Sequence, residues 1–335
     1  MDSLTQIVLG AAVGEAVLGK KIGNKALLWG AIAGTIPDLD VFVKPFTDIV
    51  TAHELHRGFS HSIIFSLLFS PVLAWCMGFV YKQKEASFKN WTLFYFLCLV
   101  THPMLDAHTT WGTQLFWPMD VKISYRNIFV VDPLYTLPFL LCCIMVLFYK
   151  RNSNTRKRIN TLGLVLSTSY LMLTFVFKGI VYFKFKDSLE KQEIDYETFT
   201  TKPTPLNSIL WSANIKTANG FLIGNYSLLD SKDTIDYTFY PNQHELLETI
   251  KDQETIKRLI KLTKGWYIAQ EIEGKLFLSD LRFGVMDVYP KPSSDFVFKY
   301  QLIENEGVLE VVEPEPKTEN MKKSLNELFT RIKGN

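Results

Sequence analysis

Histidine and aspartate residues that could bind a metal ion are concentrated in one stretch of the chain, from Ile36 to Trp117. Five of the six histidines lie there, and they form three short clusters with acidic residues. The clusters contain Asp38 and Asp40, then His53, His56 and His61, and then His102, Asp106 and His108. Imidazole and carboxylate groups are the usual ligands of zinc and related metals. These clusters therefore predict a metal site.

His102 and Asp106 have the spacing of a ligand pair on a helix. Residues four apart lie on one helical face, so both side chains can point toward the same ion. Pro103 disfavours an α-helical conformation at His102, but a helical turn that begins at Pro103 would still direct both groups to one point. A single histidine in this place would more often be a hydrogen-bonded core residue. An acid at this spacing, beside two further clusters, favours the interpretation as ligands.

The polar residues of the first two clusters allow more than one interpretation. Asp38 and Asp40 could both reach one site from a turn or an extended segment, but they could also be solvated loop residues. A free carboxylate, Asp40 or Glu54, could act as a general base. Arg57 could bind an anionic group such as phosphate, or it could be an ordinary residue of the membrane interface. The stretch Gly58–Ser62 lacks the last glycine of a GxSxG elbow, which argues against a serine nucleophile.

Long apolar runs separate and follow these clusters. The runs cover residues 63–81, 91–100, 134–149 and 161–183. A membrane-spanning helix needs roughly 17–25 apolar residues, which two of the runs provide and the others provide only with their flanks. Buried core helices of a soluble protein are the alternative, but four such runs in close succession favour an α-helical integral membrane domain over residues 1–183. The net charge of +2 gives no indication of nucleic-acid binding.

The first two apolar segments each contain a pair of glycines four residues apart, Gly10 with Gly14 and Gly30 with Gly34. Small residues at this spacing let the backbones of two membrane helices approach closely. The pattern predicts a tightly packed first hairpin. Glu15 is unusual in such a helix, and it should point either into the bundle or toward the interface.

The basic residues of the membrane domain lie in three loops. The loops cover residues 19–25, 82–90 and 150–158. Lysine and arginine are enriched in cytoplasmic loops. If all three loops are cytoplasmic, the three His/Asp clusters lie on the opposite side, at the outer leaflet of the cell membrane or inner membrane. This topology predicts an extracytoplasmic metal site.

The composition changes after the last apolar run. Residues 184–205 are charged and then rich in turn-forming residues, which predicts a linker. Residues 206–335 predict a soluble, extracytoplasmic α+β domain with strands and two helices. The predicted strands cover residues 209–216, 221–229, 235–240, 266–272, 275–283 and 296–302, and the predicted helices cover residues 243–262 and 318–333. This domain contains no His/Asp cluster, so we expect it to cover the site or to bind a protein partner that the sequence does not identify.

Several motifs together resemble the YdjM-type family of membrane-bound metal-dependent hydrolases. They are IPDLD, HRGFSHS, THPMLDAHTTWGTQLFWP and RNIFVVDPLYTLP, together with residues 1–19. Many members of that family carry a histidine where this chain has Gln6. If that histidine is a ligand, one ligand position is lost or replaced here.

The His-xxx-Asp motif at His102 is also similar to one in the superfamily of zinc phospholipases C and zinc nucleases. This resemblance implies a zinc site with six candidate ligands, namely Asp38, Asp40, His56, His61, His102 and Asp106. Either of the first two aspartates could be sufficient. The chain lacks the full ligand pattern of that superfamily.

The sequence thus favours a membrane-bound hydrolase with a divalent metal, zinc in the first place. Its expected substrate is a phosphoester, with a membrane phospholipid as one candidate because the site would lie at the level of the headgroups. Bound metal would activate water, Asp40 or Glu54 would act as the base, and Arg57 would hold the phosphate. The alternative is a membrane scaffold or transport protein whose metal is structural.

Overall fold

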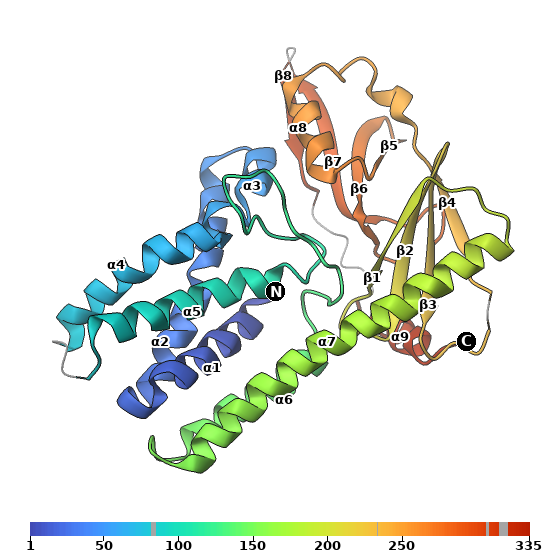
Figure 1. Ribbon diagram of the computed structural model, residues 1–335. Coiled ribbons are helices and arrows are strands. Elements are labelled where there is room, and N and C mark those ends of the chain that lie inside the picture. Colours follow the sequence, from blue (N-terminus) through green and yellow to red (C-terminus); the bar gives the residue numbers. More distant parts are fainter. Residues whose placement is uncertain (82–84, 233, 306–307, 315–320) are drawn as a thin grey trace. The chain divides into compact units, whose positions relative to one another are not determined.

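The computed structural model describes residues 1–81, 85–232, 234–305, 308–314 and 321–335 (Figure 1). Parts of two sequence predictions lie outside these residues, namely the loop at residues 82–84 and the start of the last helix at residues 318–320. The chain forms two compact units. The first contains Met1–Val43, Leu55–Phe175 and Pro205–Asn207, and the second contains Lys44–Glu54, Val176–Thr204 and Ser208–Asn335.

The first unit is helical. Its elements, in part shared with the second unit, are α1 (Ser3–Ile22), α2 (Asn24–Thr35), the 3₁₀ helix η1 (Pro37–Phe46), α3 (Ile49–Leu55), the 3₁₀ turn η2 (Phe59–His61), α4 (Ile63–Tyr81), α5 (Phe88–Asp106), α6 (Pro133–Leu147) and α7 (Asn154–Lys191). Among the described residues, α4 and α7 are long and apolar enough to cross a membrane. Helices α2 and η1 would form a third span if the 40° bend between them lies within one crossing. The predicted helical membrane region is thus confirmed with two candidate spans.

The first hairpin is packed as tightly as the glycine pairs predict. A Cβ atom placed on Gly30 would lie only 2.2 Å from the carbonyl oxygen of Gly10, and one on Gly14 would lie 2.5 Å from the carbonyl oxygen of Ala26. Helices α1 and α2 therefore touch through their backbones, and any larger side chain would force them apart. This close approach fixes the end of α2, where Gly34 lies.

Glu15 points into the helical bundle, where it forms a buried ion pair with Arg156 of α7. Arg156 Nε lies 2.6 Å from Glu15 Oε1, and Nη2 lies 2.6 Å from Oε2. The same guanidinium donates to Asn24 Oδ1 and to the carbonyl oxygens of Val146 and Tyr149. The guanidinium thus binds both carboxylate oxygens, and its other N–H groups donate to neighbouring oxygens. A buried ion pair is tolerated when its geometry is good and its remaining polar groups are hydrogen-bonded in this way.

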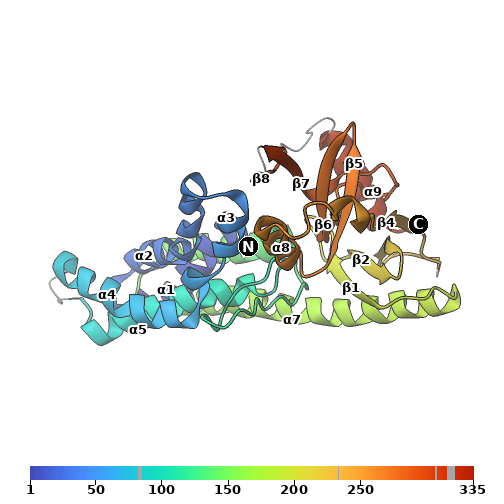
Figure 2. The same ribbon diagram turned by 90° about the horizontal axis from the view of Figure 1, so that it is seen from above.

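Helix α5 lies beside α4 and α1 (Figures 1 and 2). Its packed face carries large aromatic side chains. Trp91 and Phe94 are fully buried, and the Trp91 ring stacks on Tyr81 with centroids 5.6 Å apart. Helix α6 begins at an N-cap in which Asp132 Oδ1 accepts from the backbone N–H of Leu134 at 2.9 Å. The ends of these helices hold the loops that carry the site.

The second unit contains two four-stranded antiparallel sheets, with strand orders β1-β2-β3-β4 and β5-β6-β7-β8 (Figure 1). The strands are β1 (Thr198–Pro203), β2 (Leu210–Thr217), β3 (Gly220–Ser227), β4 (Tyr237–Pro241), β5 (Tyr267–Ile272), β6 (Lys275–Val285), β7 (Phe296–Asn305) and β8 (Val308–Val312). Three further helical elements accompany them: η3 (His244–Leu247), α8 (Glu254–Thr263) and α9 (Met321–Ile332). The predicted α+β composition is confirmed.

The segment predicted as a linker is largely regular. Residues 184–191 continue helix α7, and the threonine-rich stretch that follows forms β1, an edge strand paired with β2. The proline at its end, Pro203, is compatible with an edge strand because only one side of such a strand is paired. Strand β8 was not predicted either.

Each sheet buries one face against a helix. The C-terminal part of α7 contributes Val181 and Phe185 to an apolar cluster with Trp211 and Ile215 of β2. Helix α8 contributes Ile256 and Leu259 to a second cluster with residues of β6 and β7. The charged face of α8 stays exposed, as expected for an amphipathic helix at a protein surface.

Candidate metal centre

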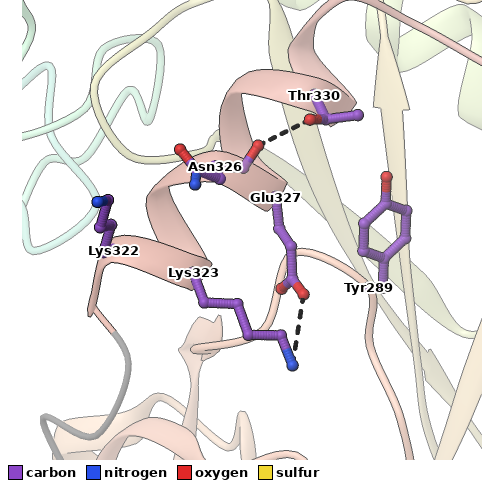
Figure 3. Close-up of a pocket in the computed structure, with 6 residues that line it drawn as sticks. All are labelled: Tyr289, Lys322, Lys323, Asn326, Glu327 and Thr330. Atoms are coloured by element: carbon purple, nitrogen blue, oxygen red, sulfur yellow. Dashed lines mark hydrogen bonds and ion pairs between the residues drawn. The ribbon is translucent and has the colours of Figure 1, made fainter.

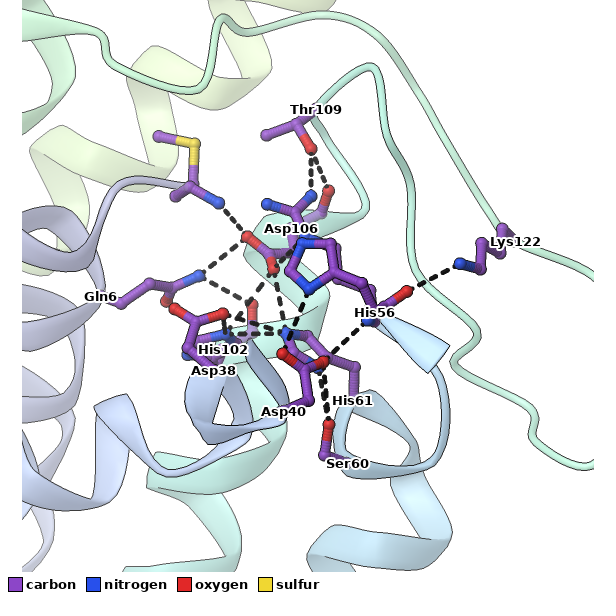
Figure 4. Close-up of polar contacts among 12 residues, drawn as sticks. Gln6, Asp38, Asp40, His56, Ser60, His61, His102, Asp106, Thr109 and Lys122 are labelled. Carbon is purple, nitrogen blue, oxygen red and sulfur yellow. Dashed lines mark hydrogen bonds and ion pairs between the residues drawn. The ribbon is translucent and has the colours of Figure 1, made fainter. Parts of the chain in front are cut away.

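Four of the predicted ligand residues lie together at one end of the helical unit (Figure 4). Asp38 comes from η1, His61 from η2, and His102 with Asp106 from the last turn of α5. The ligand atoms of all four side chains lie within 4.8 Å of one another. His61, His102 and Asp106 are fully buried, whereas the Asp38 side chain is 24% exposed. Asp38 therefore marks the accessible side of the cluster.

The distances within the cluster match those of a metal coordination shell. His61 Nε2 lies 3.2 Å from His102 Nε2, 3.3 Å from Asp38 Oδ1 and 3.3 Å from Asp106 Oδ2. His102 Nε2 lies 3.3 Å from Asp38 Oδ1 and 3.6 Å from Asp106 Oδ2. Ligands bound to zinc at about 2.0–2.2 Å in a tetrahedron lie roughly 3.3–3.6 Å apart. The four side chains thus fit a single divalent cation.

The His102 imidazole is oriented by the backbone of the first hairpin. His102 Nδ1 lies 2.6 Å from the carbonyl oxygen of Gly34. A carbonyl oxygen only accepts, so Nδ1 must carry a proton, and in the neutral ring Nε2 then presents its lone pair to the cluster. A second partner of this kind fixes the tautomer of most metal-binding histidines. The tight packing of α1 on α2 thereby contributes to the geometry of the site.

His61 is oriented by a carboxylate. Its Nδ1 lies 3.3 Å from Asp40 Oδ2 and 3.0 Å from Ser60 Oγ, so Nε2 faces the cluster. Burial opposes the charged form of this imidazole, but hydrogen bonds with the three surrounding aspartates outweigh burial and raise the pKa of His61 to about 9. The surroundings therefore favour a positive charge at this point, which a metal ion would supply.

Asp106 lies at the centre of the buried polar contacts. Its Oδ1 accepts from Gln6 Nε2 at 3.0 Å and contacts the α-amino group of Met1. Its Oδ2 is buried, and the described residues offer it no well-directed hydrogen bond, although Arg57 Nε lies 3.0 Å away. A buried carboxylate oxygen without a directed donor is costly unless a cation engages it. Asp106 Oδ2 is therefore suited to bind a metal ion.

Asp40 and His56, which were also predicted as ligands, lie beside the four-residue cluster. Asp40 Oδ2 accepts from the backbone N–H of Arg57 at 2.8 Å and from Ser60 Oγ at 3.3 Å, and its Oδ1 lies 3.1 Å from His56 Nδ1. Burial lowers the pKa of His56, against the raising effect of Asp40. Asp40 is thus positioned to orient His61 and His56.

The two other residues predicted for catalysis differ in their surroundings. Arg57 is buried, and its Nη1 donates to Thr109 Oγ1 at 2.7 Å while its Nε faces Asp106. Its backbone is left-handed, with φ of 57°, a conformation that is kept in non-glycine residues only by surrounding contacts. Glu54 belongs to the second compact unit, where Arg258 engages it at 2.6 Å.

Besides His56, two further histidines of the sequence clusters are not part of the four-residue group. His108 Nδ1 lies 3.0 Å from Asn127 Oδ1, and its ring packs against Tyr125 and Phe175. Burial lowers the pKa of His108, which favours its neutral form. His53 lies in the second compact unit.

A surface pocket beside α9 differs from the buried His/Asp cluster in that its charged side chains are exposed (Figure 3). It is lined by Tyr289, Lys322, Lys323, Asn326, Glu327 and Thr330. Lys323 pairs with Glu327 within the helix at 3.9 Å, and both of these side chains are exposed. Exposed ion pairs of this kind are solvated and contribute little to stability. The buried His/Asp cluster is therefore the stronger candidate for chemistry.

Residues 1–181 match the family of the YdjM inner membrane protein, which is more than half of the chain. The chain belongs to this family. The match confirms the resemblance of the sequence motifs, and it includes all four residues of the cluster.

Two curated proteins are similar to this YdjM-family chain over part of their length. The uncharacterized protein YfhP of Bacillus subtilis (strain 168) is 26% identical over 235 residues, which cover 67% of this chain and 68% of that protein. The inner membrane protein YbcI of Escherichia coli (strain K12) is 29% identical over 114 residues, which cover 34% of this chain and 64% of that protein. No solved structure matches the chain.

Some contacts of this YdjM-family site carry no signal in the sequence. The Gly34 carbonyl and the Thr109 hydroxyl contact the cluster residues directly, yet neither residue type suggests a metal site. Gln6 could be found only through the family pattern, and it does lie at the site, where it donates to Asp106. Backbone acceptors can be identified only once the fold is known.

Proposed function

We propose that this protein is a membrane-bound, metal-dependent hydrolase of phosphoesters with zinc as the preferred metal. The observation that carries the proposal is the spacing of the four ligand residues, the half-buried Asp38 and the buried His61, His102 and Asp106, at 3.2–3.6 Å in five of their pairs. Two imidazoles and two carboxylates form a mixed N/O set that suits zinc and other divalent metals.

The residues around the cluster take distinct roles in this proposal. A divalent metal held by these four residues would lower the pKa of water toward about 7 and polarise the scissile group. Arg57 adds a fixed positive charge beside Asp106, where a phosphoryl group would carry its negative charge. Asp40 holds the imidazoles of His61 and His56 in place. Glu54, paired with Arg258, is less suited to act as the base.

An extracytoplasmic position of the site is supported by the distribution of charge along the helices. Met1 contacts Asp106 at the start of α1, and Lys20 and Lys21 lie at the other end of the same helix. At that other end, Lys21 Nζ donates to Asn90 Oδ1. Basic residues favour the cytoplasmic side, so the site belongs at the outer leaflet. A phospholipid headgroup would reach it there, which makes a lipid phosphoester the preferred substrate.

The proposal is tested on protein purified in detergent. Bound metal is quantified, and turnover is measured on a chromogenic phosphodiester and on phospholipids in mixed micelles. We expect His102→Ala and Asp106→Ala to lose metal and at least 100-fold in turnover, while His108→Ala, a histidine outside the cluster, retains both. Turnover in the two cluster variants equal to that of the wild type would exclude them from catalysis.

A structural metal site is the second candidate, and one observation favours it. Four protein donors are enough to close a tetrahedral zinc site and leave no position for water. Replacement of zinc by cobalt separates the two cases, because the visible spectrum of cobalt reports its ligands. A spectrum that changes when inorganic phosphate is added indicates an open position and supports the hydrolase. A spectrum that stays constant supports the scaffold or transport protein.

A further inference from the structure

One segment of the N-terminal half belongs to the compact unit of the C-terminal sheets. This segment, Lys44–Glu54, lies in the sequence between Asp40 and His56, whose side chains are 3.1 Å apart beside the metal-ligand cluster. Its helix α3 is capped by Asp48 Oδ1, which accepts from the backbone N–H of Thr51 at 2.9 Å. The segment is therefore a loop whose two ends meet at the site, while its middle is held by the C-terminal domain.

Apolar contacts hold this segment within the second unit. Val50 is 1% exposed and belongs to the same buried cluster as Leu259 of α8 and Leu278 of β6. His53 is 4% exposed, and its ring centroid lies 5.8 Å from Tyr300 and 6.2 Å from Phe298 in edge-to-face geometry. Such burial requires specific docking of α3 on the sheet.

Arg258 of α8 adds directed polar contacts. Its Nη2 lies 2.6 Å from Glu54 Oε2 and its Nε lies 3.1 Å from Oε1, so the guanidinium engages the carboxylate at both oxygens. The same Nη2 lies 2.7 Å from Thr51 Oγ1. A two-point contact of this kind defines the position of the carboxylate much more narrowly than a single lysine contact would.

We propose that the C-terminal domain is a positioning element of the metal site and that Arg258 is its positioning residue. The inference rests on the proposed function for the identity of the site. Glu54 is two residues before His56. When Arg258 holds Glu54, the short connection restricts the positions of the His56 ring and of the Arg57 backbone N–H, which both contact Asp40. Since Asp40 orients His61, displacement of α3 would change the direction of a metal ligand.

This arrangement gives the C-terminal domain a function that its own residues do not suggest. An orienting group behind a metal ligand typically contributes about 10–100-fold to metal affinity. Arg258 acts one step further away, through the α3 segment and Asp40. We therefore expect its loss to weaken metal binding by about tenfold, the lower end of that range.

The experiment exchanges the two charges in the full-length protein in detergent. Zinc affinity is measured by competition with a chromophoric chelator for Arg258→Glu, for Glu54→Arg and for the double variant with both changes. We expect about tenfold weaker binding in each single variant and recovery to within about threefold of the wild type in the double variant. A general loss of folding would not be repaired by the exchange.

Two further variants control the result. Lys257→Glu makes a charge change like that of Arg258→Glu at the neighbouring exposed position of α8 and should leave zinc affinity unchanged. Arg258→Gln removes the ion pair without introducing repulsion and covers the case in which Arg258→Glu does not fold. Wild-type affinity in Arg258→Gln and Glu54→Arg, or no recovery on exchange, would overturn the inference. A wild type that binds zinc but cleaves no phosphoester would contradict only the proposed function.

Discussion

The Nε2 atoms of His61 and His102 face each other at 3.2 Å although the two residues are 41 positions apart in the chain. The opposite nitrogen of each ring has its own acceptor, Asp40 for His61 and the Gly34 carbonyl for His102. Both rings thus direct a lone pair to the same point. Two facing acceptors repel each other unless a cation or a proton lies between them, so the arrangement is that of a ligand pair.

Asp38 and Asp40 should differ in their effect on metal binding. Asp38 presents an oxygen to both histidine Nε2 atoms, so Asp38→Asn should abolish tight binding of zinc. Asp40 contacts the rear nitrogen of His61, so Asp40→Asn should retain binding with about 10–100-fold lower affinity. Isothermal titration of the metal-free proteins with zinc measures both effects. Equal losses in the two variants would contradict the assignment of one ligand and one orienting residue.

The close contact of α1 and α2 should be sensitive to a single methyl group. The Cβ of Gly30→Ala would lie 2.2 Å from the Gly10 carbonyl oxygen, which is backbone and cannot move away cheaply. We expect a loss of about 1–3 kcal/mol in the free energy of unfolding, as for other overpacked sites. Gly78→Ala in α4 is the control, because outside its own helical turn no described residue has an atom within 4 Å of the added Cβ. The free energies of unfolding of the two variants and the wild type are measured in a denaturing detergent. Equal values for Gly30→Ala and Gly78→Ala would refute the close packing.

Removal of one partner from the buried pair of Glu15 and Arg156 should be more harmful than removal of both charges. Arg156→Met leaves the Glu15 carboxylate buried and unpaired, which typically costs about 3–5 kcal/mol. The double variant Glu15→Gln with Arg156→Met removes both charges of the pair and should recover part of this loss. The same unfolding assay tests the prediction, and a double variant no more stable than Arg156→Met would argue against the ion pair.

Glu313 should make the C-terminal unit sensitive to acid. His53 Nε2 lies 3.7 Å from Glu313 Oε2, and this contact lowers the pKa of Glu313 below its ordinary value of 4.5. A lowered pKa in the folded state means that the carboxylate stabilises the fold above pH 4.5 and that this contribution is lost as the pH falls below it. In Glu313→Gln the unfolding temperature should therefore fall less between pH 6 and pH 4 than in the wild type. Parallel pH profiles would disprove the contact.

Much of the architecture could be predicted because the relevant signals are local. The uncharged run at residues 63–81 has the length of a span and forms α4, and the paired glycines of α1 and α2 predict their close packing. The threonine-rich stretch that forms β1 was interpreted as a linker, because its strand character depends on pairing with β2.

The sequence by itself determined which residue types are available for a metal and that His102 and Asp106 share one side of a helical turn, because spacing along a helix fixes direction. It did not determine which of Asp38 and Asp40 faces the imidazoles. Both lie in the 3₁₀ helix η1, where three residues complete a turn and side chains two apart point in different directions.

Only the tertiary structure decided the surroundings of the site. Glu54 is adjacent to the cluster in sequence, yet its partner is Arg258, 204 positions away, and His102 is oriented by a backbone carbonyl 68 positions away. Contacts over such distances follow from how whole elements pack, and no periodicity or spacing in the chain records them. The residues that bind are therefore visible in the sequence, whereas the groups that orient them become visible only in the fold.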